Sequence, residues 1–371
     1  MRPGIAPLPK SFALLAVCAL ACSAQLLGKA AVAQADETHL SAAPPLPIRP
    51  APSAAAALQL VTIAWSFRAG APLAAPPGIG ADGAVVVGSV DGYLHSLRPD
   101  GSFRWGYTLR GPLIGRPAVA SNGTVFAAAD PNGLYALDAE GTLLWVSSVA
   151  GGVRSAPVID RQRRLWVTTG QGTLLGFSER GGIVSFAHVG LAQAVGPTVL
   201  EDGGIAIAGV NGDLRFIAAR PGVTLRATSS SPVLALEGAR GALFVLAADG
   251  LSRFDPAVGE ERWSRRDVER LACSDPVVVV EHQGLRWLSA QGEPEAEVVV
   301  AIGGQRPVAC LSDASLLVVD DDGDLLHVDR SGIKARARLP AGRLISLDPV
   351  AGGGVIAGYR DGRVLALRLP G

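Results

Sequence analysis

The chain has 371 residues, with 33 basic and 33 acidic side chains and therefore no formal net charge. This balance argues against a nucleic-acid-binding protein, which normally shows a basic excess or a basic stripe. Glycine (46) and proline (26) are abundant and apolar residues make up 49% of the chain, which is typical of a folded, turn-rich protein rather than a disordered one.

Residues 1–35 have the features of an export signal peptide. Arg2 and Lys10 provide a positive start, residues 12–27 are apolar, and small residues near Ala33 and Ala35 offer cleavage sites. The apolar stretch is shorter than the roughly 20 residues that a membrane-spanning helix needs, and no later segment qualifies. We therefore expect a protein exported to the periplasm or cell envelope, with no transmembrane segment in the mature chain.

A lipid anchor at Cys22 is an alternative to simple cleavage. The residue three places before Cys22 is Ala19, where lipoprotein signals have leucine, so simple cleavage is favoured and lipidation stays open. Residues 36–57 are rich in proline and alanine and cannot build a packed core. They are predicted to form a disordered linker, which would also suit a tether to a lipid anchor.

Three residue types recur with one period after the linker. Tryptophans lie 40 residues apart at Trp65, Trp105 and Trp145, with Phe186 next in the series, and prolines recur every 40 residues from Pro77. A glycine before an alternating apolar strand recurs eight times at intervals of 34 to 41 residues: Gly92, Gly133, Gly172, Gly212, Gly250, Gly284, Gly323 and Gly362. Three residue types that share one period indicate structural repeats.

Each repeat is predicted to contain four antiparallel strands. Asp-Gly and Asn-Gly pairs separate short apolar runs, and such pairs favour hairpin turns because glycine accepts positive φ. Four-stranded units repeated radially form a β-propeller. The prolines then fall on the first, innermost strand, since proline suits an edge strand. Four tryptophans are predicted to end the fourth strands and fill space between blades: Trp65, Trp105, Trp145 and Trp263.

The two ends of the repeat region complete each other. Residues 58–67 have the pattern of a lone fourth strand, and the last repeat supplies only three strands. Pairing these segments closes the ring and removes two open sheet edges. The sequence therefore predicts an all-β, eight-bladed β-propeller over residues 58–371, made of four-stranded antiparallel blades and expected to be a monomer.

The repeat resembles the pyrroloquinoline-quinone-like repeat family, most clearly in DPNGLYALDAEGTLLW (130–145) followed by VRSAPVID (153–160). The resemblance covers about residues 58–371 and is weaker in the fifth to seventh repeats. Within the family, the chain is similar in size, export signal and blade number to the BamB-type scaffold of outer-membrane assembly. Quinoprotein dehydrogenases share the repeat, but they carry adjacent cysteines and a calcium site, and this chain has no adjacent cysteines.

Two cysteines follow the signal peptide, Cys273 and Cys310. They occupy similar places in successive repeats, and an oxidising compartment permits a disulfide. A disulfide needs Cα atoms within about 7 Å, whereas equivalent strands of adjacent blades are usually further apart. The spacing therefore favours two buried thiols, with a disulfide as the alternative.

Charged residues on the predicted inner strands are the candidate binding residues. Arg116, Asp275 and Asp348 each precede a proline and are expected to share a height at the channel mouth, where a polar ring would bind an anion or a partner loop. The alternative is a solvated channel mouth without a ligand. The set comprises Arg116, Arg154, Arg306, Asp275 and Asp348.

No motif in the sequence points to catalysis. The acidic run 320–324 has carboxylates suited to calcium, but it coincides with the hairpin turn of its repeat and is interpreted as a polar turn. We therefore expect a non-catalytic scaffold that binds an envelope protein, with no catalytic residues, metal or cofactor. The alternative is a propeller that binds a small ligand or pyrroloquinoline quinone with calcium in its channel.

Overall fold

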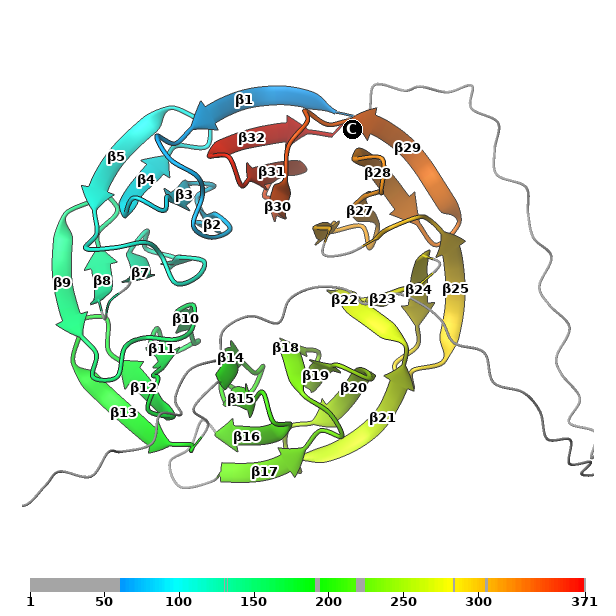
Figure 1. Cartoon of the computed structure of the whole chain (residues 1–371), viewed down its shortest axis with the longest axis horizontal. Coiled ribbons are helices and arrows are strands. Elements are labelled where there is room, and N and C mark those ends of the chain that lie inside the picture. The colour runs from blue at the N-terminus through cyan, green and yellow to red at the C-terminus, as the bar shows by residue number, and fades with distance from the viewer. Residues whose placement is uncertain are drawn as a thin grey trace, which may run out of the picture. The chain divides into compact units, whose positions relative to one another are not determined.

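Eight four-stranded antiparallel sheets form a ring in the computed structural model (Figure 1). The structure describes residues 61–369, except 130, 132, 191–193, 218–223, 283 and 304–305. Within this part of the chain all regular elements are strands, and no helix is long and apolar enough to cross a membrane. The predicted export signal (1–35), the linker (36–57) and the lipid-anchor candidate Cys22 lie outside the described residues.

The first four blades follow one another along the chain. Blade 1 contains β2 (Gly78–Ile79), β3 (Val85–Gly88), β4 (Tyr93–Leu97) and β5 (Phe103–Thr108). Blade 2 contains β6 (Ala118–Val119), β7 (Val125–Ala129), β8 (Gly133–Leu137) and β9 (Leu143–Ser148). Blade 3 contains β10 (Val158–Ile159), β11 (Leu165–Thr168), β12 (Thr173–Phe177) and β13 (Ile183–His188). Blade 4 contains β14 (Ala194–Val199), β15 (Ile205–Gly209), β16 (Asp213–Ile217) and β17 (Thr224–Thr228).

The other four blades complete the ring. Blade 5 contains β18 (Val233–Ala239), β19 (Ala242–Ala247), β20 (Gly250–Asp255) and β21 (Glu260–Arg266). Blade 6 contains β22 (Val268–Ser274), β23 (Val277–Glu281), β24 (Gly284–Leu288) and β25 (Pro294–Val299). Blade 7 contains β26 (Val308–Cys310), β27 (Leu316–Val319), β28 (Asp324–Asp329) and β29 (Gly332–Arg338). Blade 8 contains β30 (Leu344–Val350), β31 (Gly354–Tyr359), β32 (Arg363–Arg368) and β1 (Thr62–Arg68).

The predicted closure of the ring is confirmed. Strand β1 pairs antiparallel with β32, with Phe67 opposite Val364 and Arg68 opposite Arg363, so one blade contains both ends of the repeat region. The predicted strand over 58–67 is described from residue 61 onward, where β1 begins at Thr62 and continues one residue further, to Arg68. The fold class and the number of blades are therefore those that the repeat pattern predicts.

Four of the recurrent glycines, Gly92, Gly172, Gly212 and Gly362, hydrogen-bond to the segment that leads to the next blade. Gly92 has φ of 82°, and a Cβ there would lie 3.2 Å from the Leu109 carbonyl oxygen. In return the Gly92 carbonyl accepts a hydrogen bond of 2.7 Å from the Leu109 amide, and the Gly362 carbonyl accepts one of 2.9 Å from Ala69. Glycine is needed at Gly92 both for its positive φ and for this close approach.

The tryptophans at the outer strands dock onto the next blade. The indole N–H of Trp105 donates to the Ala139 carbonyl at 2.8 Å, and a Cβ at Gly141 would lie 2.6 Å from the indole ring. Trp65 makes the same contact from β1 with Pro99 at 2.8 Å. Trp145 and Trp263 bond to Glu179 and Ala290 in the same way. Apolar clusters fill the spaces between adjacent blades, so the core is divided around the ring.

Phe186 does not belong to the tryptophan series. Trp145 lies opposite Ala136, and the corresponding residue of β13 is Ser185, which lies opposite Gly176. Phe186 is one residue further along, and a shift of one residue turns a strand side chain to the other face. Its side chain is 73% exposed. The spacing of 41 residues instead of 40 therefore places the Phe186 side chain on the opposite face of its strand from Trp145.

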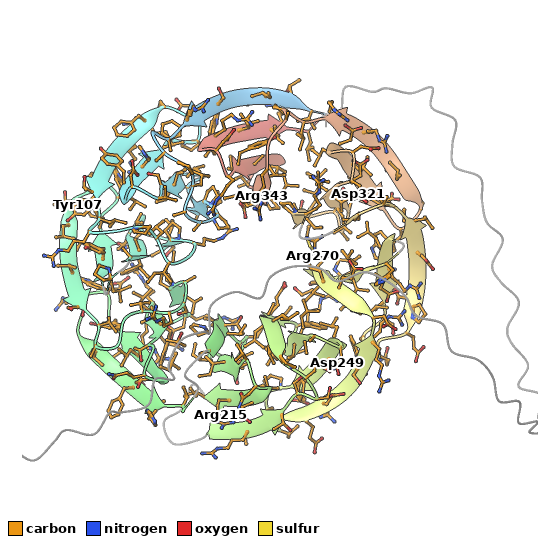
Figure 2. All side chains as sticks on the ribbon, viewed as in Figure 1. Tyr107, Arg215, Asp249, Arg270, Asp321 and Arg343 are labelled. Atoms are coloured by element: carbon orange, nitrogen blue, oxygen red, sulfur yellow. A yellow bond between two sulfur atoms is a disulfide. The ribbon has the colours of Figure 1, made fainter. Side chains whose placement is uncertain are left out.

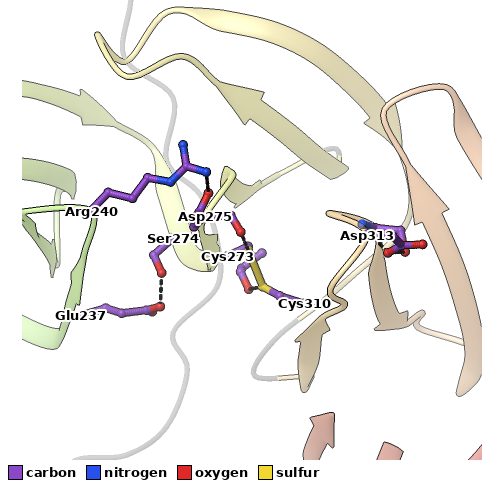
Figure 3. Close-up of a disulfide and its surroundings, with 9 residues drawn as sticks. Glu237, Arg240, Cys273, Ser274, Asp275, Cys310 and Asp313 are labelled. Atoms are coloured by element: carbon purple, nitrogen blue, oxygen red, sulfur yellow. Dashed lines mark hydrogen bonds and ion pairs between the residues drawn. A yellow bond between two sulfur atoms is a disulfide. The ribbon is translucent and has the colours of Figure 1, made fainter. Parts of the chain in front are cut away.

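The preference for two thiols is wrong. Cys273 of β22 and Cys310 of β26 form a disulfide, with their Cα atoms 5.8 Å apart (Figure 3). This separation lies within the reach of a disulfide. Both strands are the innermost of their blades, and inner strands converge toward the ring axis, so they approach more closely than the sequence argument assumed.

Candidate functional site

One pair of the predicted inner residues meets. The Nη2 atom of Arg116 lies 2.6 Å from Oδ1 of Asp348. Arg116 precedes β6 of blade 2 and Asp348 lies in β30 of blade 8, so the ion pair bypasses blade 1. The Asp348 side chain is only 12% exposed, and its Oδ2 atom has no hydrogen-bond partner among the described residues. The pair links the closing blade to a non-neighbouring one.

Asp275 does not share the height of Arg116, contrary to the expectation from the prolines. It lies in the two-residue turn between β22 and β23, where Ser274 pairs with Val277, whereas Arg116 lies before its inner strand. Asp275 forms an ion pair with Arg240 of blade 5 (Figure 3). Ser274 donates a hydrogen bond to Glu237 across the same pair of blades. Polar contacts therefore hold the turn between β22 and β23 of blade 6 to blade 5.

Arg154 and Arg306 lie apart from these pairs. Arg154 is exposed, and its amide donates to the Thr168 carbonyl at 2.8 Å. Arg306 donates from Nη2 to the Asp321 carbonyl at 3.2 Å. The five predicted residues thus do not form one polar ring: two form an ion pair, one pairs with Arg240, and two remain without a carboxylate partner among the described residues.

Arg270 is an inner arginine that the sequence analysis missed. It lies in β22, and Figure 2 shows it on the inner side of the ring. Its Nη1 donates to the Arg306 carbonyl, while Nε and Nη2 are buried without a partner among the described residues. Burial lowers the pKa of Arg270. No proline or repeated neighbour marks this position, so periodicity offered no signal for it.

A network of charges lies between blades 5 and 6. Glu281 accepts a hydrogen bond of 2.5 Å from Arg265 Nε and lies 3.2 Å from Arg286 Nε, and Arg286 also pairs with Glu297 at 2.9 Å. A small hollow of about 210 Å³ adjoins these side chains. Because the carboxylates are matched by arginines, the network joins two blades and leaves little free charge for a ligand.

The acidic run 320–324 is likewise engaged by the protein. Asp320 accepts a hydrogen bond from the Asp324 amide at 2.8 Å and pairs with Arg336 at 2.9 Å, and Asp324 pairs with Arg338 at 2.7 Å. These contacts fit the interpretation of the run as a polar turn. Within the described residues, no group of three or more His, Cys, Asp and Glu side chains is arranged to hold a metal ion.

Two neighbouring outer strands expose apolar side chains. Strands β9 (LLWVSS) and β13 (IVSFAH) are the only outer strands of the eight blades whose sequences contain no Asp, Glu, Lys or Arg. Outer strands β21, β25 and β29 each carry at least two charged residues. We call the following set the apolar rim: Leu143, Leu144, Val146, Ile183, Val184 and Phe186, whose exposures range from 38% to 73%.

Comparisons with solved structures agree with the fold. The chain is 21% identical to BamB from Moraxella catarrhalis, with a TM-score of 0.53 over 83% of this chain and 88% of that one. It is 12% identical to the C-terminal WD40 domain of Sif2, with a TM-score of 0.67 over 85% of this chain and 99% of that one. The computationally designed Ika8 protein is 15% identical, with a TM-score of 0.65 over 81% and 98% of the two chains.

These structural likenesses show the propeller fold alone, because the identities are low. A comparison with curated proteins found no match. A family model described as "Outer membrane protein assembly factor BamB" matches residues 53–264, more than half of the chain. The eight blades, the closing strand and this match together place the chain in the BamB family of pyrroloquinoline-quinone-like propellers.

Proposed function

We propose that the chain is a non-catalytic scaffold that is exported to the cell envelope and binds another protein there. Its family model carries the description of an outer-membrane assembly factor, which supports an envelope role and a protein partner. The predicted signal over residues 1–35 supports export. A ring of blades held together by docked tryptophans provides a rigid surface on which a partner can bind.

The apolar rim is the observation that carries this proposal. Each outer strand ends its sheet, so one edge of its backbone has no neighbouring strand within the blade. Soluble proteins protect such edges with charged residues, as β21, β25 and β29 do. Strands β9 and β13 lack this protection and expose large apolar side chains. Such exposed apolar side chains suit a partner that covers them with an apolar strand or face.

The inner charged residues support a structural interpretation. Arg116 pairs with Asp348 and Asp275 pairs with Arg240, each joining two blades of the ring. Such pairs hold the scaffold together and provide neither a nucleophile nor a base aimed at an open site. We therefore propose no reaction for this protein.

The proposal is tested by crosslinking in cells followed by affinity purification of the tagged chain. Wild-type protein should recover one specific envelope protein. Phe186→Asp should reduce the amount recovered by about tenfold, because a charge would be buried in the contact. Ser264→Asp is the matched control, because Ser264 follows Trp263 on β21 as Phe186 follows the corresponding Ser185 on β13. Equal recovery with both variants would contradict a role for the rim.

A quinone cofactor in the channel is the second candidate, and one observation favours it. Two buried guanidinium nitrogens of Arg270 have no partner among the described residues, and Figure 2 shows this residue on the inner side of the ring. Pyrroloquinoline quinone is an anion that such a cation would attract. The donor set for the accompanying calcium does not fit, since no metal-binding group occurs in the described residues. Titration with the quinone and Ca²⁺ tests it: a saturable change in cofactor absorbance would support this candidate, and an unchanged spectrum would remove it.

A further inference from the structure

A hollow of about 480 Å³ lies between blades 7 and 8. Its walls come from the turn between β27 and β28, the connection from β29 to β30, and Arg306, which precedes β26. A volume of this size falls within the range of about 300 to 1,000 Å³ that is usual for small-ligand sites. In contrast to the smaller hollow beside blade 6, it has a substantial apolar wall.

The apolar wall is formed by Leu339, Leu344 and Tyr359, together with Val319 and Pro340. Tyr359 lies opposite Leu344 in blade 8. The corresponding positions in the first three blades, which lie opposite Leu73, Leu113 and Val153, hold small residues: Ser89, Ala129 and Thr169. A large aromatic side chain at this position is therefore a departure from the repeat, and it supplies one side of the hollow.

The hydroxyl group of Tyr359 is unsatisfied. It is buried and has no hydrogen-bond partner among the described residues. Burial raises the pKa of Tyr359, so the hydroxyl stays protonated and keeps a hydrogen to donate. A buried donor without an acceptor is costly. An acceptor atom on a bound ligand would relieve that cost.

The hollow also contains a positive charge without an ion-pair partner. Arg306 lines it, and no carboxylate in the described part of the chain pairs with its guanidinium group, which donates only to the Asp321 carbonyl at 3.2 Å. The second arginine of the lining, Arg338, is neutralised by Asp324 at 2.7 Å. Of the two lining aspartates, Asp321 accepts the Gly303 amide at 2.6 Å, and Asp322 lies in the turn. An anion would therefore bind to the Arg306 guanidinium on the side away from the Asp321 and Asp322 carboxylates.

We propose that this hollow binds a carboxylate-bearing ligand whose neighbouring group is apolar. Arg306 pairs with the carboxylate, and the wall of Leu339, Leu344 and Tyr359 packs against the apolar group. Two sources share this chemistry: a free apolar carboxylic acid, and the C-terminal carboxylate of a polypeptide that ends in an apolar residue. The inference does not depend on the scaffold role, because the hollow is formed by blades 7 and 8 and the apolar rim by blades 2 and 3.

The test measures Kd by ligand-observed NMR titration of the intact mature protein with four probes. N-acetylphenylalanine has the carboxylate and the apolar group, and its primary amide lacks the charge. The peptide GGSGF, with a free or an amidated C-terminus, represents the polypeptide source. We expect at least one of the two acids to bind about tenfold or more tightly than its own amide. Tighter binding of the peptide acid would identify a polypeptide end, and tighter binding of N-acetylphenylalanine a free acid.

Variants assign the binding to the hollow. Arg306→Gln removes the charge and should raise the Kd of the preferred acid by about tenfold or more. Arg306→Lys keeps the charge and should raise that Kd by less than about fivefold. Ala341→Trp, at an exposed lining position, should block the site. Arg226→Gln, on the exposed face of β17, is the control and should leave Kd unchanged. Circular dichroism confirms that each variant folds.

Three results would overturn the inference. The first is equal binding of each acid and its amide. The second is no saturable binding of any probe up to about 10 mM, where the binding free energy is only about −3 kcal/mol. The third is an unchanged Kd in folded Arg306→Gln and Ala341→Trp proteins. Either variant alone is informative, so a folding failure of one leaves the test intact.

Discussion

Arg116 and Asp348 form an ion pair of 2.6 Å although a whole blade separates the blades that carry them. Asp348 belongs to blade 8, whose fourth strand, β1, comes from the beginning of the repeat region. Strand β1 closes the ring by pairing with β32 inside blade 8. The ion pair is a separate connection, which joins blade 8 to blade 2. The closure therefore has a backbone part and an electrostatic part.

Removing Arg116 should leave Asp348 without its charge partner. We expect Arg116→Ala to lower the free energy of unfolding by about 1–2 kcal/mol, a value kept small because the Arg116 side chain is 42% exposed. A double-mutant cycle with Asp348→Ala, measured by urea denaturation, should show a coupling of about 1 kcal/mol. Strictly additive effects would mean that the contact contributes nothing to closure.

Trp65 tests the docking of the closing strand. Trp65→Ala removes the indole that bonds to Pro99 and packs on Gly101 of blade 1, and should cost about 2 kcal/mol or more. Ser66→Ala, at an exposed position on the same strand, should change stability by less than about 0.5 kcal/mol. Thermal unfolding gives both values. A similar effect of the two substitutions would contradict the docking role of the tryptophan.

The disulfide should stabilise the ring between blades 6 and 7. Cys273 and Cys310 are separated by 37 residues, and cross-links over loops of this size contribute about 2–4 kcal/mol. The double variant Cys273→Ala/Cys310→Ala should be destabilised by this amount. Reductant should lower the free energy of unfolding of the wild-type protein but not that of the variant. Mass spectrometry of unreduced peptides gives an independent check, and finding both thiols free would refute the cross-link.

His95 should make stability sensitive to mild acid. Its ring lies 4.6 Å from the Tyr93 ring and 5.2 Å from the Phe67 ring of β1. Burial lowers the pKa of His95, and the Asp91 carboxylate offsets this only in part. The unfolded chain therefore binds a proton more readily than the folded protein, so stability is complete above the unfolded pKa and falls as the pH drops below about 6.5.

The check is a comparison of unfolding free energies between pH 7.5 and 5.5. Wild-type protein should lose up to about 1.4 kcal/mol per pH unit through this one group. His95→Phe, which keeps an aromatic ring and removes the titrating group, should show a shallower decline. Parallel curves for the two proteins would show that His95 does not contribute.

The repeat pattern was sufficient to predict the fold. Glycines such as Gly92 are fixed by a positive φ and by the close approach of the next segment, so they keep their period and identify the blades. Trp105 and Trp145 are fixed by a contact that every such blade repeats. Features that the geometry imposes on each blade alike were therefore visible in the sequence.

The candidate sites depend on residues that occur only once. Arg270 and Tyr359 depart from the repeat, so periodicity contains no signal for their contacts. Phe186 was assigned to the wrong face because one residue of spacing separates the two faces of a strand. The approach of Cys273 to Cys310 depends on how closely inner strands converge, which is a property of the closed ring and not of a single blade.

The most direct test of the scaffold proposal is site-specific photo-crosslinking in living cells. A photoreactive residue is placed at Phe186 or Val146 on the apolar rim, and at Ser264 as the matched position on the charged strand β21. The proposal predicts a light-dependent adduct with one envelope protein from both rim positions and little or none from Ser264. Absence of adducts at the rim, or equal adducts at all three positions, would contradict the claim that the rim binds a protein partner.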